Sequence, residues 1–166
     1  LFIPNNKIND IVDTIADKIN KSRITDPLFV AVLNGSFVFA ADIMRRINLP
    51  NAEISFIKLA SYLGTESTGD IKELIGFNQD ISRRNIIILE DIIDTGNTLE
   101  NIVSSLKLQN INDIKIATLL FKPDAYKRDI LIDYIGKEIS NDFVVGYGLD
   151  YDEIGRNLPH IYKLKE

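Results

Sequence analysis

Residues 86–99 read IIILEDIIDTGNTL, and this stretch decides the predicted fold. Four apolar residues lead into two adjacent acids, Glu90 and Asp91, and a second apolar pair precedes a glycine-containing turn at residues 94–98. A continuous apolar run is typical of a strand buried on both faces, and the residues after the turn have helical spacing. The stretch therefore predicts a buried parallel strand that opens into a phosphate-binding loop and a helix.

Strand and helix patterns alternate through the rest of the chain. Residues 61–74 contain two glycines and little apolar content, and we expect a polar loop there. Alternation of this kind predicts an α/β fold with a central, mostly parallel sheet flanked by helices. The expected strands are 28–33, 53–60, 86–89, 114–121, 130–135 and 143–145, and the expected helices are 8–19, 37–47 and 99–106, the first of them capped from residues 4–6.

Composition limits the classes of protein to consider. The chain has 166 residues, 45% hydrophobic and 26% charged, as expected for one globular domain. A net charge of −5 disfavours nucleic acid and anionic membranes as partners. The sequence has no cysteine, no apolar run near the roughly 20 residues needed to span a bilayer and no visible leader, so we expect a cytoplasmic protein. The single histidine, His160, is interpreted as a surface or hinge residue.

Polar motifs follow four of the predicted strands. They are Asn34-Gly35, Ser61-Tyr62, residues 90–98 and Lys122. In open α/β sheets ligands bind beyond the carboxyl ends of the strands, so these motifs are expected to converge in space. Their convergence predicts an active site.

The turn at residues 94–98 has the chemistry of an anion site. Successive backbone N–H groups and a helix N-terminus favour a phosphate, although the turn alone is equally compatible with simple helix capping. Glu90 and Asp91 favour the first interpretation, because two carboxylates beside a buried strand need a cation or hydrogen-bond donors. Sugar hydroxyls with Mg²⁺ would supply both. Neither a Walker A loop nor a G-x-G-x-x-G fingerprint is present.

Residues 86–99 resemble the phosphoribosyl pyrophosphate (PRPP) signature of type I phosphoribosyltransferases. Four further stretches resemble motifs of the hypoxanthine-guanine phosphoribosyltransferase family: VLNGSF at 32–37, SYLGTESTG at 61–69, LLFKP at 119–123 and DFVVGYGLDYDEIGRNLP at 142–159. The resemblance implies one phosphoribosyltransferase domain over residues 1–166, with a core at about 25–140 and a small hood from the N-terminal and C-terminal segments. It also implies a homodimer or homotetramer.

The implied activity is purine salvage. N9 of hypoxanthine or guanine would take the phosphoribosyl group of PRPP, giving inosine or guanosine monophosphate and pyrophosphate, with Mg²⁺ as cofactor. By resemblance, Asp94 is the general base or acid, and PRPP is bound by Glu90, Asp91, Asp94, Thr95, Gly96, Asn97 and Thr98. The remaining implied sites are Asn34, Gly35 and Arg156 for pyrophosphate, Lys122, Phe143, Val144 and Asp150 for the purine, Ser61 and Tyr62 in a mobile loop, and Glu90, Asp91 and Asp150 for the metal.

Several of these assignments have plainer alternatives. Considered alone, Lys122 and Arg156 are compatible with solvated surface residues, and Phe143 with plain core. Position 34 is Asn where many family members have a lysine that helps to hold pyrophosphate. A larger share of pyrophosphate binding would therefore fall to the backbone amides around Gly35 and to Arg156. The family pattern also predicts a cis peptide between Leu33 and Asn34.

Two alternatives to the implied function stay open. One is an enzyme of the same fold that prefers xanthine; adenine is disfavoured because its amino group cannot accept a hydrogen bond from Lys122. The other is a regulator that senses PRPP or a nucleotide without catalysis, which would be expected to show a basic face.

Overall fold

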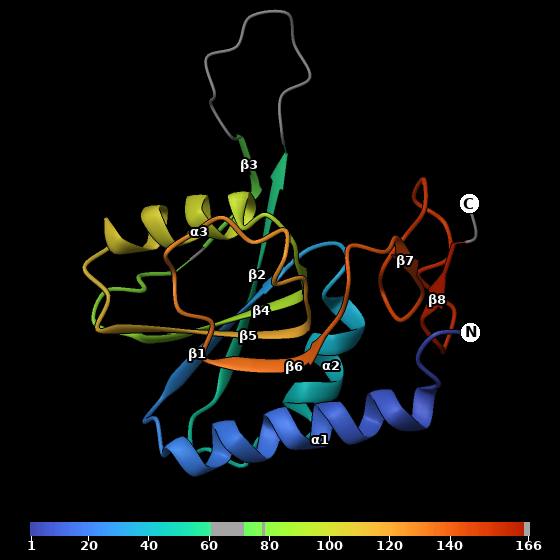
Figure 1. Ribbon diagram of the computed structural model, residues 1–166. Coiled ribbons are helices and arrows are strands. Elements are labelled where there is room, and N and C mark those ends of the chain that lie inside the picture. The colour runs from blue at the N-terminus through green and yellow to red at the C-terminus, as the bar shows by residue number, and fades with distance from the viewer. Residues whose placement is uncertain (61–71, 78, 165–166) are drawn as a thin grey trace, which may run out of the picture.

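A computed structural model describes residues 1–60, 72–77 and 79–164. The described residues form a six-stranded sheet in the order β3-β2-β1-β4-β5-β6 (Figure 1). Five strands are parallel and only β3, at one edge, is antiparallel, which confirms the predicted fold class. The strands are β1 Pro27–Val32, β2 Glu53–Ala60, β3 Lys72–Ile75, β4 Asn85–Ile93, β5 Asp113–Phe121 and β6 Tyr134–Glu138; β7 Val144–Val145 and β8 Tyr162–Lys163 pair separately.

Helices cover both faces of the sheet. α1 (Asn5–Ser22) and α2 (Phe37–Met44) lie below it in Figure 1, and α3 (Asn97–Lys107) lies above it. Alternate strand residues point to opposite faces, so Phe29 and Leu89 pack with α1 and α2 whereas Val30 and Ile88 pack with α3. Two apolar layers therefore hold β1 and β4 in the middle of the molecule.

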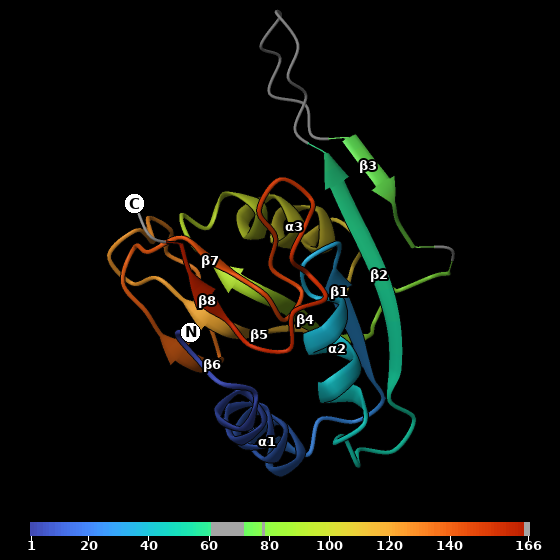
Figure 2. The same cartoon turned by 90° about the vertical axis from the view of Figure 1, so that its right-hand side faces the viewer.

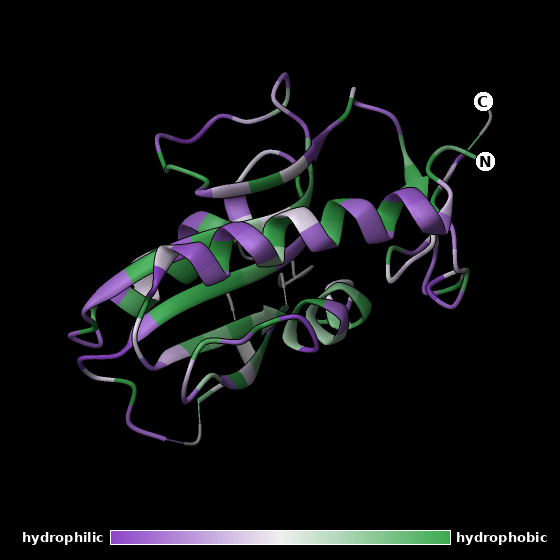
Figure 3. Ribbon diagram, turned by 90° about the horizontal axis from the view of Figure 1, so that it is seen from below, coloured by the Kyte–Doolittle hydropathy of each residue, from purple (hydrophilic) through white to green (hydrophobic). Residues whose placement is uncertain are grey.

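The N-terminal segment lies beside β8 (Figures 1 and 2). Ile3 forms an antiparallel bridge with Ile161, and the His160 Nδ1 accepts a 2.9 Å hydrogen bond from the backbone N–H of Asn5. α1 therefore receives its first cap from the C-terminal segment, since Pro4 makes no side-chain cap. Seen from below, α1 alternates hydrophilic and hydrophobic residues, as expected of a helix with one buried face (Figure 3).

Several element boundaries differ from the sequence prediction, including the end of α2 at Met44 rather than residue 47. β4 does not end before the acids but continues to Ile93, because residues 90–93 keep pairing with β5. β6 spans Tyr134–Glu138 rather than 130–135, since Ile132 packs against the α3 face instead of joining the sheet. β3 occupies part of the expected loop at 61–74; residues 61–71 lie outside the described residues.

Membrane spans were searched across the described parts of the chain. No helix there is both long enough and apolar enough to cross a bilayer.

Candidate active site

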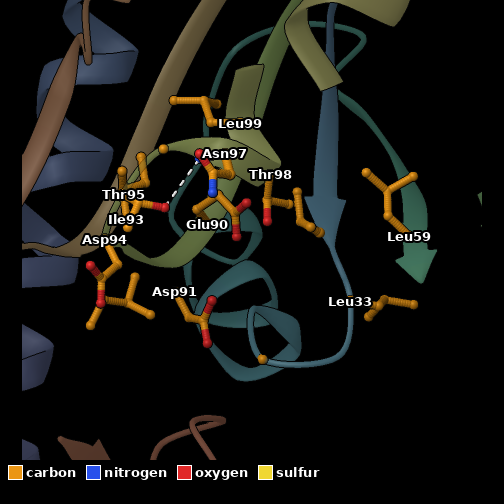
Figure 4. Close-up of a pocket in the computed structure, with 14 residues that line it drawn as sticks. Leu33, Leu59, Glu90, Asp91, Ile93, Asp94, Thr95, Asn97, Thr98 and Leu99 are labelled. Atoms are coloured by element: carbon orange, nitrogen blue, oxygen red, sulfur yellow. Dashed lines mark hydrogen bonds between the residues drawn. The ribbon is translucent and has the colours of Figure 1, made fainter. Parts of the chain in front are cut away.

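A cavity of about 320 Å³ opens at the carboxyl ends of β1, β2 and β4 (Figure 4). The turn between β4 and α3, residues 94–98, lines it, and we call this the phosphate turn after its predicted ligand. Gly96 has a φ of 84°, and a Cβ there would lie 2.6 Å from the Tyr126 ring, so the turn requires glycine. The lining residues are Val32, Leu33, Gly35, Leu59 and all ten residues of 90–99.

The turn presents hydrogen-bond donors at a helix N-terminus. Thr95 Oγ1 accepts a hydrogen bond of 3.4 Å from the Asn97 amide, and Thr98 is the second residue of α3. The positive end of an eleven-residue helix faces the cavity at this point. The arrangement fits a phosphate group, as the sequence predicts.

Two carboxylates from the end of β4 share the cavity. Glu90 is only 6% exposed, and its burial, with the neighbouring charge of Asp91, raises its pKa well above the usual range. Burial also raises the pKa of Asp91, to about 6, although two backbone N–H groups and the charge of Arg156 oppose the change. Both carboxylates are therefore costly to ionise until a ligand compensates them.

The loop after β1 approaches Asp91 very closely. A Cβ on Gly35 would overlap the Asp91 carboxylate, so a larger residue there would displace the Asp91 side chain. The Leu33–Asn34 peptide is cis, as predicted. Ser36 is fully buried, and its hydroxyl donates 2.7 Å to the carbonyl of Val32.

Lys122 and Asp94 form an ion pair across the strand ends. Lys122 Nζ donates a 2.9 Å hydrogen bond to Asp94 Oδ2, and the Lys122 backbone N–H donates 3.0 Å to the Ile93 carbonyl. Only 11% of the Lys122 side chain is exposed. Lys122 is thus not a solvated surface lysine.

The C-terminal segment adds a second charged group. Arg156 lies 2.9 Å from Asp150 Oδ1 and donates 2.9 Å to the Gly148 carbonyl. Asp150 Oδ2 accepts a hydrogen bond from the Glu153 amide. Gly148, which the Arg156 bond holds, lies directly against the carbonyl of Gly35, a residue that lines the cavity.

Two of the four proposed purine residues, Phe143 and Val144, lie at the start of β7. Phe143 is exposed and packs edge-to-face on Tyr151, with ring centroids 5.8 Å apart, whereas Val144 is buried. Phe143 is therefore not core. Its neighbour Asp142 has its pKa lowered by hydrogen bonds from Lys163 and Ser140 and, more weakly, by the charges of Lys163 and Lys122.

The structure thus brings most of the predicted residues to one edge of the sheet. Gly35 and residues 90–98 line one cavity, Lys122 is hydrogen-bonded to Asp94 at this cavity, and Arg156 is hydrogen-bonded to Gly148, which contacts Gly35. Ser61 and Tyr62 lie outside the described residues. His160, the only histidine, caps α1.

Sequence reasoning missed Arg128. Its guanidinium hydrogen-bonds the Asn97 side chain, and its Nε lies 2.7 Å from Glu100 Oε2. The backbone N–H of the preceding Lys127 donates 3.3 Å to the Thr95 carbonyl. The segment after β5 therefore packs on the phosphate turn, and no local pattern around residue 128 indicates this long-range contact.

A divalent cation fits the donor set chemically. Glu90 and Asp91 are adjacent, oxygen-bearing and difficult to ionise alone, and a hard cation would favour their charged forms. Within the part of the chain that the structure describes, no three acidic, histidine or cysteine side chains form a complete metal cage. A cation here would therefore need oxygen ligands from substrate or water as well.

A parallel sheet whose central strand ends in paired carboxylates and an anion-binding turn defines the type I phosphoribosyltransferase class. A family model described as phosphoribosyl transferase domain matches residues 4–152. A hypoxanthine-guanine phosphoribosyltransferase from Staphylococcus epidermidis is 46% identical over 137 residues, 82% of this chain and 76% of that protein. A hypoxanthine phosphoribosyltransferase from Buchnera aphidicola is 41% identical over 159 residues, 95% and 89% of the two chains.

Solved structures agree with these matches. A crystal structure of a hypoxanthine phosphoribosyltransferase from Staphylococcus aureus superimposes with a TM-score of 0.92 at 38% identity, covering 99% of this chain and 90% of that one. A hypoxanthine-guanine phosphoribosyltransferase from Bacillus anthracis gives 0.90 at 37%, with 99% and 97% covered. The chain belongs to the hypoxanthine-guanine phosphoribosyltransferase family of enzymes.

Proposed function

We propose that the protein transfers the 5-phosphoribosyl group of PRPP to N9 of hypoxanthine or guanine, releasing pyrophosphate and the nucleoside monophosphate. The observation that carries the proposal is the Lys122–Asp94 pair at the rim of the phosphate turn. A lysine donor suits the exocyclic O6 of a 6-oxopurine, and a carboxylate beside it suits the proton lost from the base.

The proposed roles follow the chemistry of each group. The amides and hydroxyls of Thr95, Gly96, Asn97 and Thr98 hold the 5′-phosphate, and Glu90 and Asp91 accept from the ribose hydroxyls. Asp94 takes the proton from the purine. Phe143 stacks on the base and the Val144 main chain contacts its edge. Ser61 and Tyr62 are assigned to a loop that excludes water from the reactive ribosyl centre.

Charge on the departing pyrophosphate is the main electrostatic demand of the reaction. Arg156 is the cationic side chain we assign to it, with backbone N–H groups at Asn34 and Gly35. Glu90, Asp91 and Asp150 would hold Mg²⁺, which when bound supplies positive charge to the pyrophosphate oxygens. Asp150 already pairs with Arg156 and the Glu153 amide, so its role would require these contacts to rearrange.

A spectrophotometric assay tests the proposal directly. The protein is mixed with PRPP, Mg²⁺ and, in turn, hypoxanthine, guanine, xanthine or adenine. Turnover of hypoxanthine or guanine above adenine is expected, and failure with every oxopurine contradicts the proposal. A preference for xanthine would support the second candidate substrate, which the contacts of Phe143 and Asp150 leave open.

Three further features belong to the same proposal. We propose a single domain over residues 1–166 with a core at about 25–140 and a hood from both terminal segments, which the Ile3–Ile161 bridge supports. Cytoplasmic location and a homodimer or homotetramer are proposed from family membership. Light scattering on the purified protein measures the assembly, and a monomeric mass would reject the oligomer.

A further inference from the structure

A buried tyrosine links the C-terminal segment to α2. Tyr147 is 3% exposed, and its hydroxyl donates a hydrogen bond to Asp42, 105 positions earlier in the chain. Burial, followed by this contact with Asp42, raises the pKa of Tyr147 above its usual range, so the hydroxyl remains a donor. Tyr147 has a φ of 54°, an unusual backbone conformation for a tyrosine.

Asp42, which accepts this bond, is held by contacts of its own. It lies on the inner side of α2, only 9% exposed, and pairs with Arg45. Arg46 donates 3.0 Å to the Asp42 carbonyl and also pairs with Asp13 on α1. The carboxylate that receives the Tyr147 hydroxyl is therefore charge-balanced and fixed on two packed helices.

The residue after Tyr147 touches the loop after β1. A Cβ on Gly148 would overlap the Gly35 carbonyl, so these two backbones are in direct contact. Gly148 also exchanges hydrogen bonds with Arg156: its N–H donates 3.0 Å to the Arg156 carbonyl, and its carbonyl accepts 2.9 Å from the guanidinium. Arg156 and the Gly35 loop thus meet on a single glycine next to Tyr147.

The Tyr147–Asp42 hydrogen bond, called the tie below, joins two segments that lie next to the Gly35 loop. α2 begins at Phe37, directly after the loop that contains Gly35, and Asp42 is on its second turn. The Tyr147–Asp42 bond therefore ties the segment that carries Arg156 to the helix that carries the loop. A tie of this kind sets the distance between the two groups, because neither end can move without the other.

We propose that Tyr147 and Asp42 are positioning residues that hold Arg156 and the Gly35 loop at the separation required by pyrophosphate. This rests on the proposed function, and neither side chain needs to touch substrate. The alternative is that the hydroxyl merely satisfies its own burial, in which case losing it would lower stability without selecting among ligands.

The variant Tyr147→Phe distinguishes the positioning role from the purely structural one. Kd values for magnesium pyrophosphate and for inosine monophosphate are measured by calorimetry, with KM for PRPP and hypoxanthine in the forward assay. We expect Kd for pyrophosphate and KM for PRPP to rise about 10- to 100-fold. Kd for the nucleotide and KM for hypoxanthine should stay within about threefold, because the 5′-phosphate turn and Lys122 are not part of the tie.

Tyr162→Phe is the matched control, since it removes a hydroxyl from β8, outside the tie, and should change none of these constants. Asp42→Asn tests the other end, and in the double variant with Tyr147→Phe the losses should not add, because one bond carries both. Urea unfolding checks that each variant is folded.

Two results overturn the proposal: equal weakening of pyrophosphate and nucleotide, or no change in either. The binding titrations need no turnover, so they decide the role of Tyr147 even if the wild-type protein transfers nothing to any purine. That separate result would reject the proposed function instead.

Discussion

Lys122 Nζ lies 2.9 Å from Asp94 Oδ2, so the side chain at the end of β5 is paired with the first residue of the phosphate turn. The lysine is nearly buried, while about half of the carboxylate is exposed. In the absence of purine each group balances the charge of the other. Under the proposed function, the O6 atom of an incoming 6-oxopurine accepts a hydrogen bond from Lys122, which is also paired with Asp94.

Lys122→Gln keeps a hydrogen-bond donor but removes the charge. We expect KM for hypoxanthine to rise about 10- to 100-fold, because a charge-assisted bond is lost, while KM for PRPP changes little. Steady-state kinetics with each substrate varied in turn measures both constants. Lys127→Gln, an exposed lysine five residues on, serves as the control and should behave as wild type. A rise of KM for PRPP alone would contradict the assignment.

Asp94→Asn retains the shape and one acceptor oxygen but cannot take a proton. We expect kcat to fall about 10²- to 10⁴-fold if Asp94 is the proton-transfer group. The binding of inosine monophosphate, measured by calorimetry, should change far less than kcat. An unchanged kcat would remove Asp94 from this role.

Asp91→Asn is expected to stabilise the ligand-free protein while impairing its activity. Burial raises the pKa of Asp91 to about 6, above the value of roughly 4 in an unfolded chain, so the folded state holds the proton more tightly than the unfolded state. The stabilising effect of that proton is fully present below about pH 4 and is lost as pH rises through 6. At pH 7.5 we expect the variant to gain roughly 1 to 3 kcal/mol in free energy of unfolding.

Urea unfolding in EDTA at pH 4.5 and 7.5 measures this gain. The difference between variant and wild type should shrink at the lower pH, where Asp91 is largely protonated in the wild type. Asp152→Asn, at an exposed carboxylate, is the control and should show no comparable gain. A variant less stable than wild type at pH 7.5 would show that ionised Asp91 does not destabilise the folded protein.

Arg128→Gln tests the contact between the segment after β5 and α3. The guanidinium balances Glu100 in the first turn of the helix, and without it the free carboxylate repels a bound phosphate. We expect Kd for inosine monophosphate to rise about 10-fold. The double variant with Glu100→Gln should recover part of the loss, and calorimetry measures all three proteins. Equal losses in the single and double variants would exclude this charge effect.

His160→Ala removes the acceptor that caps the first amide of α1. We expect a loss of about 1 kcal/mol in free energy of unfolding, the usual cost of a lost helix cap, with kcat unchanged. Urea denaturation compares it with Asn6→Ala, an exposed neighbour at the same helix end. A fall in kcat without a fall in stability would give His160 a part in catalysis.

The buried strand and the helix predicted within residues 86–99 are confirmed, because the information for them is local. An apolar run followed by a glycine turn favours a buried strand and a helix start, whereas phosphate binding at the turn stays a prediction. The errors came where pairing decided the structure. β4 extends through Glu90 and Asp91 because β5 continues to pair with it. β6 begins only at Tyr134, and Ile132 packs in the apolar cluster on the α3 side of the sheet.

The sequence by itself determined the order of strands and helices, the phosphate turn and the groups expected at the strand ends, since each depends on neighbours within a few residues. Only the tertiary structure decided which distant groups meet. Arg128 on the turn, Tyr147 on Asp42 and the shift in the pKa of Asp91 all depend on segments far apart in the chain. Burial and charge at these contacts are properties of the packed molecule, and they make one site of the separate motifs.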